Sequence, residues 1–269
     1  MPESAENLAV ALLQANLYWE DTTANLAMLE EQIAALSEPA DVLVLPEMFS
    51  TGFSMNAARV AEAMNVTTTR WMKQMAAKTG ALVVGSFAVK EEGKYYNRLL
   101  CVRPDGTYQA YDKRHLFRMG QEHDTYTAGT QRLVVEWKGW RICPLVCYDL
   151  RFPVWSRNSQ AAPYDLLLYV ANWPARRTYA WHTLLRARAI ENQCYVAGVN
   201  RVGADGNGIE HLGGSQLIDF LGEPITDLGE AEAAKVVNIE KAPLVTYREK
   251  FPAYLDADSF ELQTEKPAR

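Results

Sequence analysis

Three reactive side chains come directly after apolar runs of this sequence. Glu47 follows Val-Leu-Val-Leu-Pro, Lys113 follows a run that ends at Asp112, and Cys147 follows Ile-Cys-Pro-Leu-Val. In a pocket that excludes water, the carboxylate can take the thiol proton, while the ammonium favours the thiolate and can hold a developing oxyanion. Taken singly, each residue is typical of an ordinary role, either a solvated charge at a strand end or a buried structural cysteine.

The elements that must position these residues are strands alternating with helices. In the first half the apolar pattern predicts strands over 6–16, 40–49 and 80–89, which alternate with helices over 22–37 and 66–80. A hairpin around Pro104-Asp105-Gly106 follows. The second half repeats the order, with strands over 164–173 and 194–203 and a helix over 180–193. Hairpins are predicted around Lys138-Gly139 and Leu221-Gly222. The repeat concerns the pattern of elements, not residue identity.

This pattern predicts an α/β fold of two packed sheets flanked by helices. The runs at 42–45 and 166–171 are continuously apolar, which is typical of strands covered on both faces. No linker or low-complexity segment divides the chain, so a single domain is expected. Strand ends from both halves can then converge on one ligand site.

Composition limits the classes of partner. The 269 residues are 48% hydrophobic and carry a formal net charge of −6, which favours neither nucleic acid nor an anionic membrane. The short basic run at 113–118 is a poor nucleic-acid patch. Residues 1–20 start acidic and lack the basic region of a signal peptide, and no apolar run is long enough to span a bilayer. Four cysteines are too few for a disulfide framework, so a cytoplasmic protein is expected.

Three segments, VLPEMF at 44–49, YDKRHLF at 111–117 and LVCYDLRFP at 145–153, resemble the signature segments of the nitrilase superfamily of carbon-nitrogen hydrolases, in the same order. The resemblance implies a four-layer α-β-β-α sandwich, with one hydrolase domain over 1–269 and a C-terminal tail from about residue 243. It also implies an assembly of at least dimers, and chemistry that uses no metal or organic cofactor.

The same resemblance implies roles for individual residues. Glu47 matches the general base, Lys113 the lysine of the triad and Cys147 the nucleophile, with the backbone N–H of Tyr148 as an oxyanion donor. The family has a second glutamate after the lysine segment, and Glu122, nine residues beyond Lys113, stands in that loop. The alternative for Glu122 is a solvated loop acid.

Within the superfamily, CYDLRFP, NWPARR at 172–177 and the segment 184–203 are similar to omega-amidases. That likeness implies a small-molecule substrate with a primary amide at one end and a 2-oxo acid at the other, such as 2-oxoglutaramate or 2-oxosuccinamate. A cationic side chain must hold the carboxylate. Arg176 and Arg177 are the candidates, because an arginine fork grips a carboxylate through two hydrogen bonds. A surface basic pair before a helix is the alternative. Two aromatic residues, Trp173 and Phe49, complete the predicted substrate-binding set.

Several other interpretations remain open. Cys143 and Cys147 could bind zinc, but no histidine pair accompanies them. A Cys-His protease would need His182 or His211 near Cys147. Asp149 and Arg151 are expected to shape the turn after the nucleophile. A nitrilase, an N-carbamoyl amide hydrolase and an amidase for deaminated glutathione share the same triad, and a non-catalytic interaction module would keep the fold without the chemistry.

Overall fold

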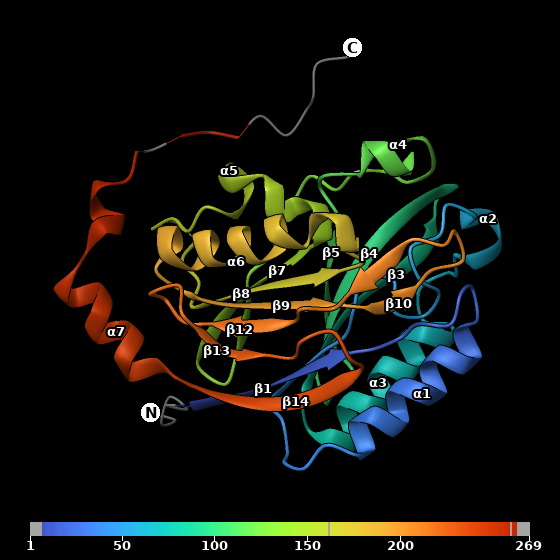
Figure 1. Cartoon of the computed structure of the whole chain (residues 1–269), viewed down its shortest axis with the longest axis horizontal. Coiled ribbons are helices and arrows are strands. Elements are labelled where there is room, and N and C mark those ends of the chain that lie inside the picture. Colours follow the sequence, from blue (N-terminus) through green and yellow to red (C-terminus); the bar gives the residue numbers. More distant parts are fainter. Residues whose placement is uncertain (1–6, 161, 259, 263–269) are drawn as a thin grey trace.

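Two six-stranded mixed sheets form the centre of the molecule (Figure 1). The computed structural model describes residues 7–160, 162–258 and 260–262. The strands of the first sheet, in the order β14-β1-β2-β3-β4-β5, are Ala233–Glu240, Asn7–Gln14, Val42–Val44, Leu82–Glu91, Lys94–Val102 and Tyr108–Asp112. In this sheet β1, β2 and β3 are parallel, and β14, β4 and β5 extend it by antiparallel pairing.

The second sheet has the same design. Its strands, in the order β13-β12-β9-β8-β7-β6, are Pro224–Asp227, Gln216–Ile218, Tyr195–Asn200, Leu166–Ala171, Trp140–Val146 and Val135–Trp137. Here β7, β8 and β9 are parallel, and the other strands pair antiparallel at the edges. A separate two-stranded hairpin is formed by β10 (Val202–Ala204) and β11 (Glu210–Leu212).

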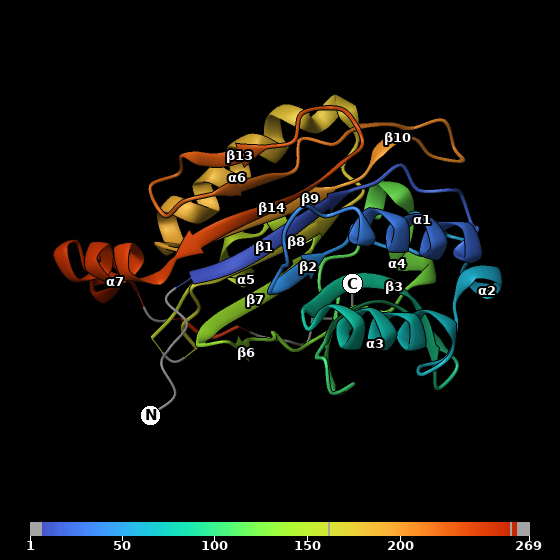
Figure 2. The ribbon, with the colours of Figure 1, turned by 90° about the horizontal axis from the view of Figure 1, so that it is seen from below.

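Helices cover the outer face of each sheet, which makes the four-layer α-β-β-α sandwich that the sequence predicted (Figure 2). The first sheet is covered by α1 (Thr22–Ala34) and α3 (Thr67–Thr79), and the second by α6 (Thr178–Asn192). The remaining short helices are α2 (Ala57–Val60), α4 (Glu122–Thr125), α5 (Pro153–Ser156), η1 (Arg118–Gly120), η2 (Cys147–Arg151), η3 (Ala175–Arg177) and η4 (Ala253–Asp256). No helix in these described ranges combines the length and apolarity that crossing a membrane requires.

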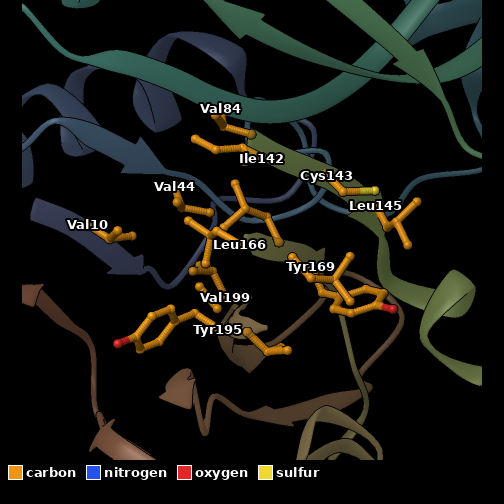
Figure 3. Packing of buried hydrophobic residues seen from close by; sticks show 14 of the residues in the cluster. Val10, Val44, Val84, Ile142, Cys143, Leu145, Leu166, Tyr169, Tyr195 and Val199 are labelled. Carbon is orange, nitrogen blue, oxygen red and sulfur yellow. The ribbon is translucent and has the colours of Figure 1, made fainter. Parts of the chain in front are cut away.

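The main core lies between the two sheets (Figure 3). Val44 and Val84 of the first sheet face Ile142 and Leu166 of the second, and all four side chains are fully buried. Leu43 points to the opposite face of β2 and joins a second core under α1 and α3. Burial on both faces explains the continuous apolar runs, since each such side chain contributes about 1.5–3 kcal/mol to folding.

Strand direction brings the reactive residues to one edge of the sandwich. β2 ends at Val44, three residues before Glu47, and β5 ends at Asp112, one residue before Lys113. In the other sheet β7 ends at Val146, one residue before Cys147. The four-layer fold therefore gathers the carboxyl ends of strands from both sheets, as the alternating pattern predicted.

One strand of the first sheet was not predicted from the sequence. β14 follows the hairpin at Leu221-Gly222 and pairs antiparallel with all eight residues of β1. Its alternation of exposed and buried residues is weak, and its partner lies more than 200 residues away in the chain. β2 is also shorter than the predicted strand at 40–49, because Leu45 to Phe49 turn away from the sheet to form the site.

The chain after β14 continues into α7 (Lys241–Lys250). Figure 1 shows α7 away from both helix layers, at one end of the sheets. Leu244 of this helix is fully buried, and Arg248 donates to Asp165 at 2.9 Å. A tail from about residue 243 and a domain over 1–269 stay predictions, and residues 1–6 and 263–269 of that domain lie outside the described residues.

Candidate active site

Glu47 is fully buried, and both of its carboxylate oxygens accept hydrogen bonds. Oε1 accepts from Lys113 Nζ at 2.8 Å and from Asn97 Nδ2 at 2.8 Å. Oε2 accepts from the backbone N–H of Asn172 at 2.9 Å, and Asn172 Nδ2 donates to the Glu47 carbonyl oxygen. The residue after Glu47, Met48, has a φ of 45°, so a sharp backbone turn aims the carboxylate inward.

Lys113 and Glu122 complete the charged cluster. The Lys113 side chain is 1% exposed, and its Nζ donates to Glu122 Oε2 at 2.9 Å as well as to Glu47. Burial opposes charge on Lys113, but the Glu122 and Glu47 carboxylates outweigh it and hold the pKa of the ammonium above its ordinary value. Burial raises the pKa of Glu122, while Lys113 opposes this rise. Glu122 is fully buried, so the alternative of a solvated loop acid is excluded.

Cys147 lies where β7 ends and the 3₁₀ helix η2 begins, and its φ of 42° is rare for a residue with a side chain. This turn places Sγ 3.9 Å from the carbonyl oxygen of Asn172. Burial, and next the negative charge of the Glu47 carboxylate, raise the pKa of Cys147 well above its ordinary value. The resting group is therefore a thiol, and it needs a base before it can attack.

The turn after Cys147 is fixed by Asp149, as the sequence predicted, whereas Arg151, which was expected to shape the same turn, lines the pocket instead. The Asp149 carboxylate is fully buried and accepts from the Val146 N–H at 3.0 Å and from the Tyr111 hydroxyl at 2.7 Å. The same carboxylate accepts from the His115 N–H at 3.0 Å. Asp149 thus ties the Cys147 turn to the segment around Lys113, which comes from the other sheet.

A pocket opens above these groups. Its walls come from both sheets and from the β10–β11 hairpin and are formed by Glu47, Phe53, Met55, Lys113, Phe117, Met119, Gly120, Cys147, Tyr148, Arg151, Asn172, Trp173, Pro174, Arg176, Arg177, Asp205, Asn207, Ile209 and His211. All of the predicted site residues line this pocket except two: Glu122, which contacts Lys113 from outside the pocket wall, and Phe49.

Three arginines, Arg151, Arg176 and Arg177, line one side of this pocket, and we call them the arginine cluster. Among the residues that the structure describes, none forms an ion pair with any of the three. Burial, and next the charges of Arg176 and Arg151, lower the pKa of Arg177. The cluster therefore presents positive charge that the described part of the chain leaves unpaired.

The guanidinium of Arg177 has weak partners. Its Nη2 donates to the Met119 thioether at 3.3 Å, and its carbon lies 5.3 Å from the centre of the Phe117 ring. Trp173 is almost fully buried and donates from Nε1 to the Arg177 carbonyl oxygen at 2.8 Å. The Arg151 guanidinium lies 4.9 Å from the Trp173 ring centre. The predicted pair of arginines is thus joined by a third.

Phe49 lies elsewhere. Its ring packs 5.7 Å from that of Trp71 and 6.4 Å from that of Phe87, in the core under the helices of the first sheet. The turn at Met48 sends Glu47 and Phe49 to opposite sides of the chain, and strand-end proximity in the sequence could not reveal this. Phe49 is therefore left out of the site, and Phe53 stands in the pocket wall instead.

The other interpretations of the cysteines find no support in the geometry. Cys143 is fully buried within β7, and the described residues contain no group of three potential metal ligands. His182 is not part of the pocket wall. His211 is, but its Nδ1 contacts the Gly203 carbonyl oxygen, and burial, with Arg201, lowers its pKa to about 4. The carboxylate whose charge acts most strongly on Cys147 is that of Glu47, and no histidine among the described residues contributes to its pKa.

Sequence reasoning missed Asn97 and Asn172, which bond directly to Glu47. Both asparagines stand at strand positions, Asn97 within β4 and Asn172 directly after β8. A polar amide within or next to an apolar run was the available signal, because a buried amide needs hydrogen-bond partners. The β10–β11 hairpin, which contributes Asp205 and Asn207, gave no chemical signal of its own.

Known proteins match this chain over nearly its whole length. The family model described as carbon-nitrogen hydrolase matches residues 9–248. The omega-amidase YafV of Escherichia coli strain K12 is 52% identical over 256 residues, which cover 95% of this chain and 98% of the relative. The 2-oxoglutaramate amidase of Bacillus subtilis is 34% identical over 250 residues, which cover 92% of this chain and 96% of the relative.

Solved structures agree with the fold. The XC1258 protein of Xanthomonas campestris, described as a CN-hydrolase superfamily protein with an arsenic adduct in its active site, superposes with a TM-score of 0.93 at 49% identity, covering 96% of this chain and 99% of its own. An amidase from Nesterenkonia has a TM-score of 0.80 at 27% identity, covering 92% and 96%.

Proposed function

The chain belongs to the carbon-nitrogen hydrolase family, and from this premise we propose that it is an omega-amidase. The proposed substrate is a 2-oxo dicarboxylic acid monoamide such as 2-oxoglutaramate or 2-oxosuccinamate, which is hydrolysed to the 2-oxo acid and ammonia. One observation carries the proposal: the Cys147 thiol and the buried Glu47 carboxylate line one pocket together with three arginines that form no ion pair among the described residues. The names of two relatives, an omega-amidase and a 2-oxoglutaramate amidase, support it.

Glu47 acts as general base on Cys147 in the proposed mechanism. The raised pKa of Cys147 means that the thiol keeps its proton until the base removes it during attack. Sγ then attacks the carbon of the primary amide, and the C–S bond forms as the carbonyl π electrons move to oxygen. Burial of both groups keeps water from competing at this step.

Lys113 and the backbone N–H of Tyr148 stabilise the tetrahedral oxyanion. Lys113 Nζ contacts both Glu122 oxygens, at 3.0 and 2.9 Å, and Glu47 Oε1 at 2.8 Å. One N–H shared between the two Glu122 oxygens leaves a third N–H for the substrate oxygen. A donor of this kind is worth about 10²–10³ in kcat.

Ammonia leaves when Glu47 returns the proton to the amide nitrogen and the C–N bond breaks. The product at this stage is a thioester between Cys147 and the acyl group. Glu47 then removes a proton from water, which attacks the thioester, and Cys147 recovers its proton as the 2-oxo acid departs. Glu122 acts as a positioning residue, because it holds the Lys113 ammonium from the side away from the pocket.

The arginine cluster holds the far carboxylate of the substrate. Arg177 is the principal ligand in this proposal, since its only side-chain acceptor among the described residues is a thioether. A carboxylate is a much stronger acceptor, and its charge would oppose both the burial and the repulsion from Arg176 and Arg151 that lower the pKa of Arg177. Trp173 helps to hold Arg177 in place, because its Nε1 donates to the Arg177 carbonyl oxygen.

We also propose a homodimer or larger assembly of this chain and a cytoplasmic location. The family resemblance supports the assembly, and the apolar residues exposed near the end of the described chain, Phe251 at 57% and Leu255 at 57%, are consistent with burial against another copy. All four cysteines are free thiols, as expected in a reducing compartment.

The proposal is tested by ammonia release from a panel of substrates: 2-oxoglutaramate, 2-oxosuccinamate, a nitrile, an N-carbamoyl amino acid and deaminated glutathione. Greatest kcat/KM on the two 2-oxo acid amides is expected, and greatest turnover on the nitrile would overturn the amidase assignment. Release of ammonia from none of the compounds would favour the non-catalytic interaction module, against which the presence of Glu47, Lys113 and Cys147 on one pocket stands.

A further inference from the structure

Asn97 lies directly behind the charged cluster and outside the pocket wall. It is fully buried on β4, and its Nδ2 donates to Glu47 Oε1 at 2.8 Å and to Glu122 Oε1 at 3.2 Å. Lys113 Nζ donates to the same two oxygens, at 2.8 and 3.0 Å. Two nitrogen donors and two oxygen acceptors therefore close a ring of four hydrogen bonds.

The amide orientation follows from its neighbours. An oxygen turned toward two carboxylates would be repelled by both, so the nitrogen must face them. The backbone N–H of Lys113 donates to the backbone carbonyl oxygen of Asn97 at 3.0 Å, which ties β4 to the end of β5 at this residue. The side chain itself is held through its Nδ2 by the two carboxylates.

Asn97 adds hydrogen-bond donors to the ring without adding charge. Glu47 approaches Asn97 from the loop after β2, Glu122 from α4 and Lys113 from the end of β5, so two negative charges meet one positive charge. Tyr126 and Cys147 are the next titratable groups around the carboxylates, and both are neutral because burial raises the pKa of each. The Asn97 Nδ2 group donates one N–H to Glu47 Oε1 and the other to Glu122 Oε1, the same two oxygens to which Lys113 donates.

The two oxygens of Glu47 are therefore unequal. Oε1 accepts two hydrogen bonds, from Asn97 and Lys113, so both of its lone pairs are occupied. Oε2 accepts one, from the Asn172 N–H at 2.9 Å, and keeps a lone pair. A proton taken from Cys147 can bind Oε2 without displacing a donor, whereas binding at Oε1 would break the ring.

We propose that Asn97 is a positioning residue that keeps Glu47 Oε1 and Glu122 Oε1 occupied, and so directs the thiol proton to Glu47 Oε2. This inference rests on the proposed function of the same site, because it assigns Glu47 as the base. It explains why a neutral amide, not a second cation, stands between two carboxylates: a cation there would stabilise the charge of Glu47 and weaken it as a base.

Asn97→Asp tests the inference, since it keeps the shape of the side chain and replaces the donor with a third acceptor. We expect kcat to fall about 100-fold, while KM changes less than about threefold because Asn97 does not line the pocket. The acid limb of the kcat profile should move to higher pH by about one unit, because added negative charge disfavours the carboxylate form of the base. The serine of Asn97→Ser is too short to donate to both carboxylates and adds no charge. This variant should lower kcat, with a smaller shift of the acid limb of the kcat profile.

Asn192→Asp is the matched control. Asn192 is also buried, and its Nδ2 donates to a carbonyl oxygen, that of Arg188, at 2.9 Å. We expect this variant to lower Tm and to leave the pH profile where it is. A profile of Asn97→Asp that coincides with that of Asn192→Asp would reduce Asn97 to a structural residue and overturn the inference.

Alkylation of Cys147 by iodoacetamide separates this inference from the proposed function, because it needs no amide substrate. The rate is measured against pH by mass spectrometry of the intact protein, with Cys147→Ala to subtract reaction at Cys101, Cys143 and Cys194. A shift of the Asn97→Asp rate profile to higher pH supports the inference even if no amide is hydrolysed. Unshifted alkylation profiles in both Asn97 variants, in a protein that hydrolyses amides, would overturn the inference and leave the function standing. If Asn97→Asp does not fold, the profile of Asn97→Ser decides.

Discussion

The charged cluster at the bottom of the pocket and the arginine cluster at its side are opposites. Below, Glu47, Lys113 and Glu122 are buried and paired with one another at 2.8–2.9 Å. At the side, Arg151, Arg176 and Arg177 have no acidic partner among the described residues. The charged cluster has its partners within the protein, whereas the arginine cluster could pair with an anion. In the proposed mechanism the first cluster does the chemistry and the second selects the substrate.

Cys147→Ala should have the largest effect, because it removes the proposed nucleophile, from which Glu47 of the charged cluster takes a proton. We expect kcat for 2-oxoglutaramate to fall by at least about 10⁴-fold, with little change in Tm. The variant should still bind the substrate, since the arginine cluster is intact, and calorimetry measures that binding. A Cys147→Ala protein that retained full amide hydrolysis would rule out the covalent mechanism.

Lys113→Met breaks the paired cluster itself. It removes an oxyanion donor and leaves the buried Glu47 and Glu122 carboxylates facing each other, so we expect kcat to fall by about 10³-fold and the free energy of unfolding to fall by about 3–5 kcal/mol. Chemical denaturation and steady-state kinetics measure the two effects. Glu122→Gln, which relieves the repulsion, should restore part of the stability in the double variant but not the activity.

Arg177→Ala tests the unpaired cluster. Loss of a charge-assisted pair with the substrate carboxylate should raise KM for 2-oxoglutaramate about 10- to 100-fold and leave kcat within about threefold. A neutral amide of similar length is the control substrate, and its KM should not change. Arg176→Ala should raise KM less than Arg177→Ala. If both variants had the same KM as the unchanged protein, the proposal that the arginine cluster binds the substrate carboxylate would be wrong.

The smallest effect is expected at a paired cluster far from the pocket. Asp165 bonds to Arg141, Lys241 and Arg248, and burial, which alone would raise its pKa, is outweighed by Arg141 and Lys241, which lower it to about 2. A lowered pKa stabilises the fold above about pH 4, and this stabilisation, roughly 2 kcal/mol, is lost as the pH falls toward 2.

Asp165→Asn should remove that acid dependence and lower Tm at neutral pH, while kcat and KM stay within about twofold. Thermal unfolding between pH 2 and 7 measures the first effect and ammonia release the second. A large loss of activity in Asp165→Asn would show that paired charges matter to the chemistry even away from the pocket. The assignment of catalysis to the charged cluster at the pocket alone would then be wrong.

Much of the site was predictable from the sequence, because its reactive residues stand at strand ends within three segments that resemble the nitrilase signature. An apolar run that stops at Glu47, Lys113 or Cys147 is a local pattern, and strand ends of α/β folds meet at one edge. The convergence of these residues in one cluster and pocket agrees with that prediction. The failure at Phe49 is equally local: one residue in the left-handed region, Met48, reversed the direction of the next side chain.

The sequence by itself determined the alternation of strands and helices and the two-sheet architecture, since periodicity is a property of short segments. The identity of the reactive side chains came from three segments that resemble the nitrilase signature. Only the tertiary structure decided the pairing of β14 with β1, the ring that Asn97 closes and the addition of Arg151 to the arginine cluster. Each of these joins segments that are distant in the chain. Their contacts depend on sheet order and on the geometry of turns, which no local pattern encodes.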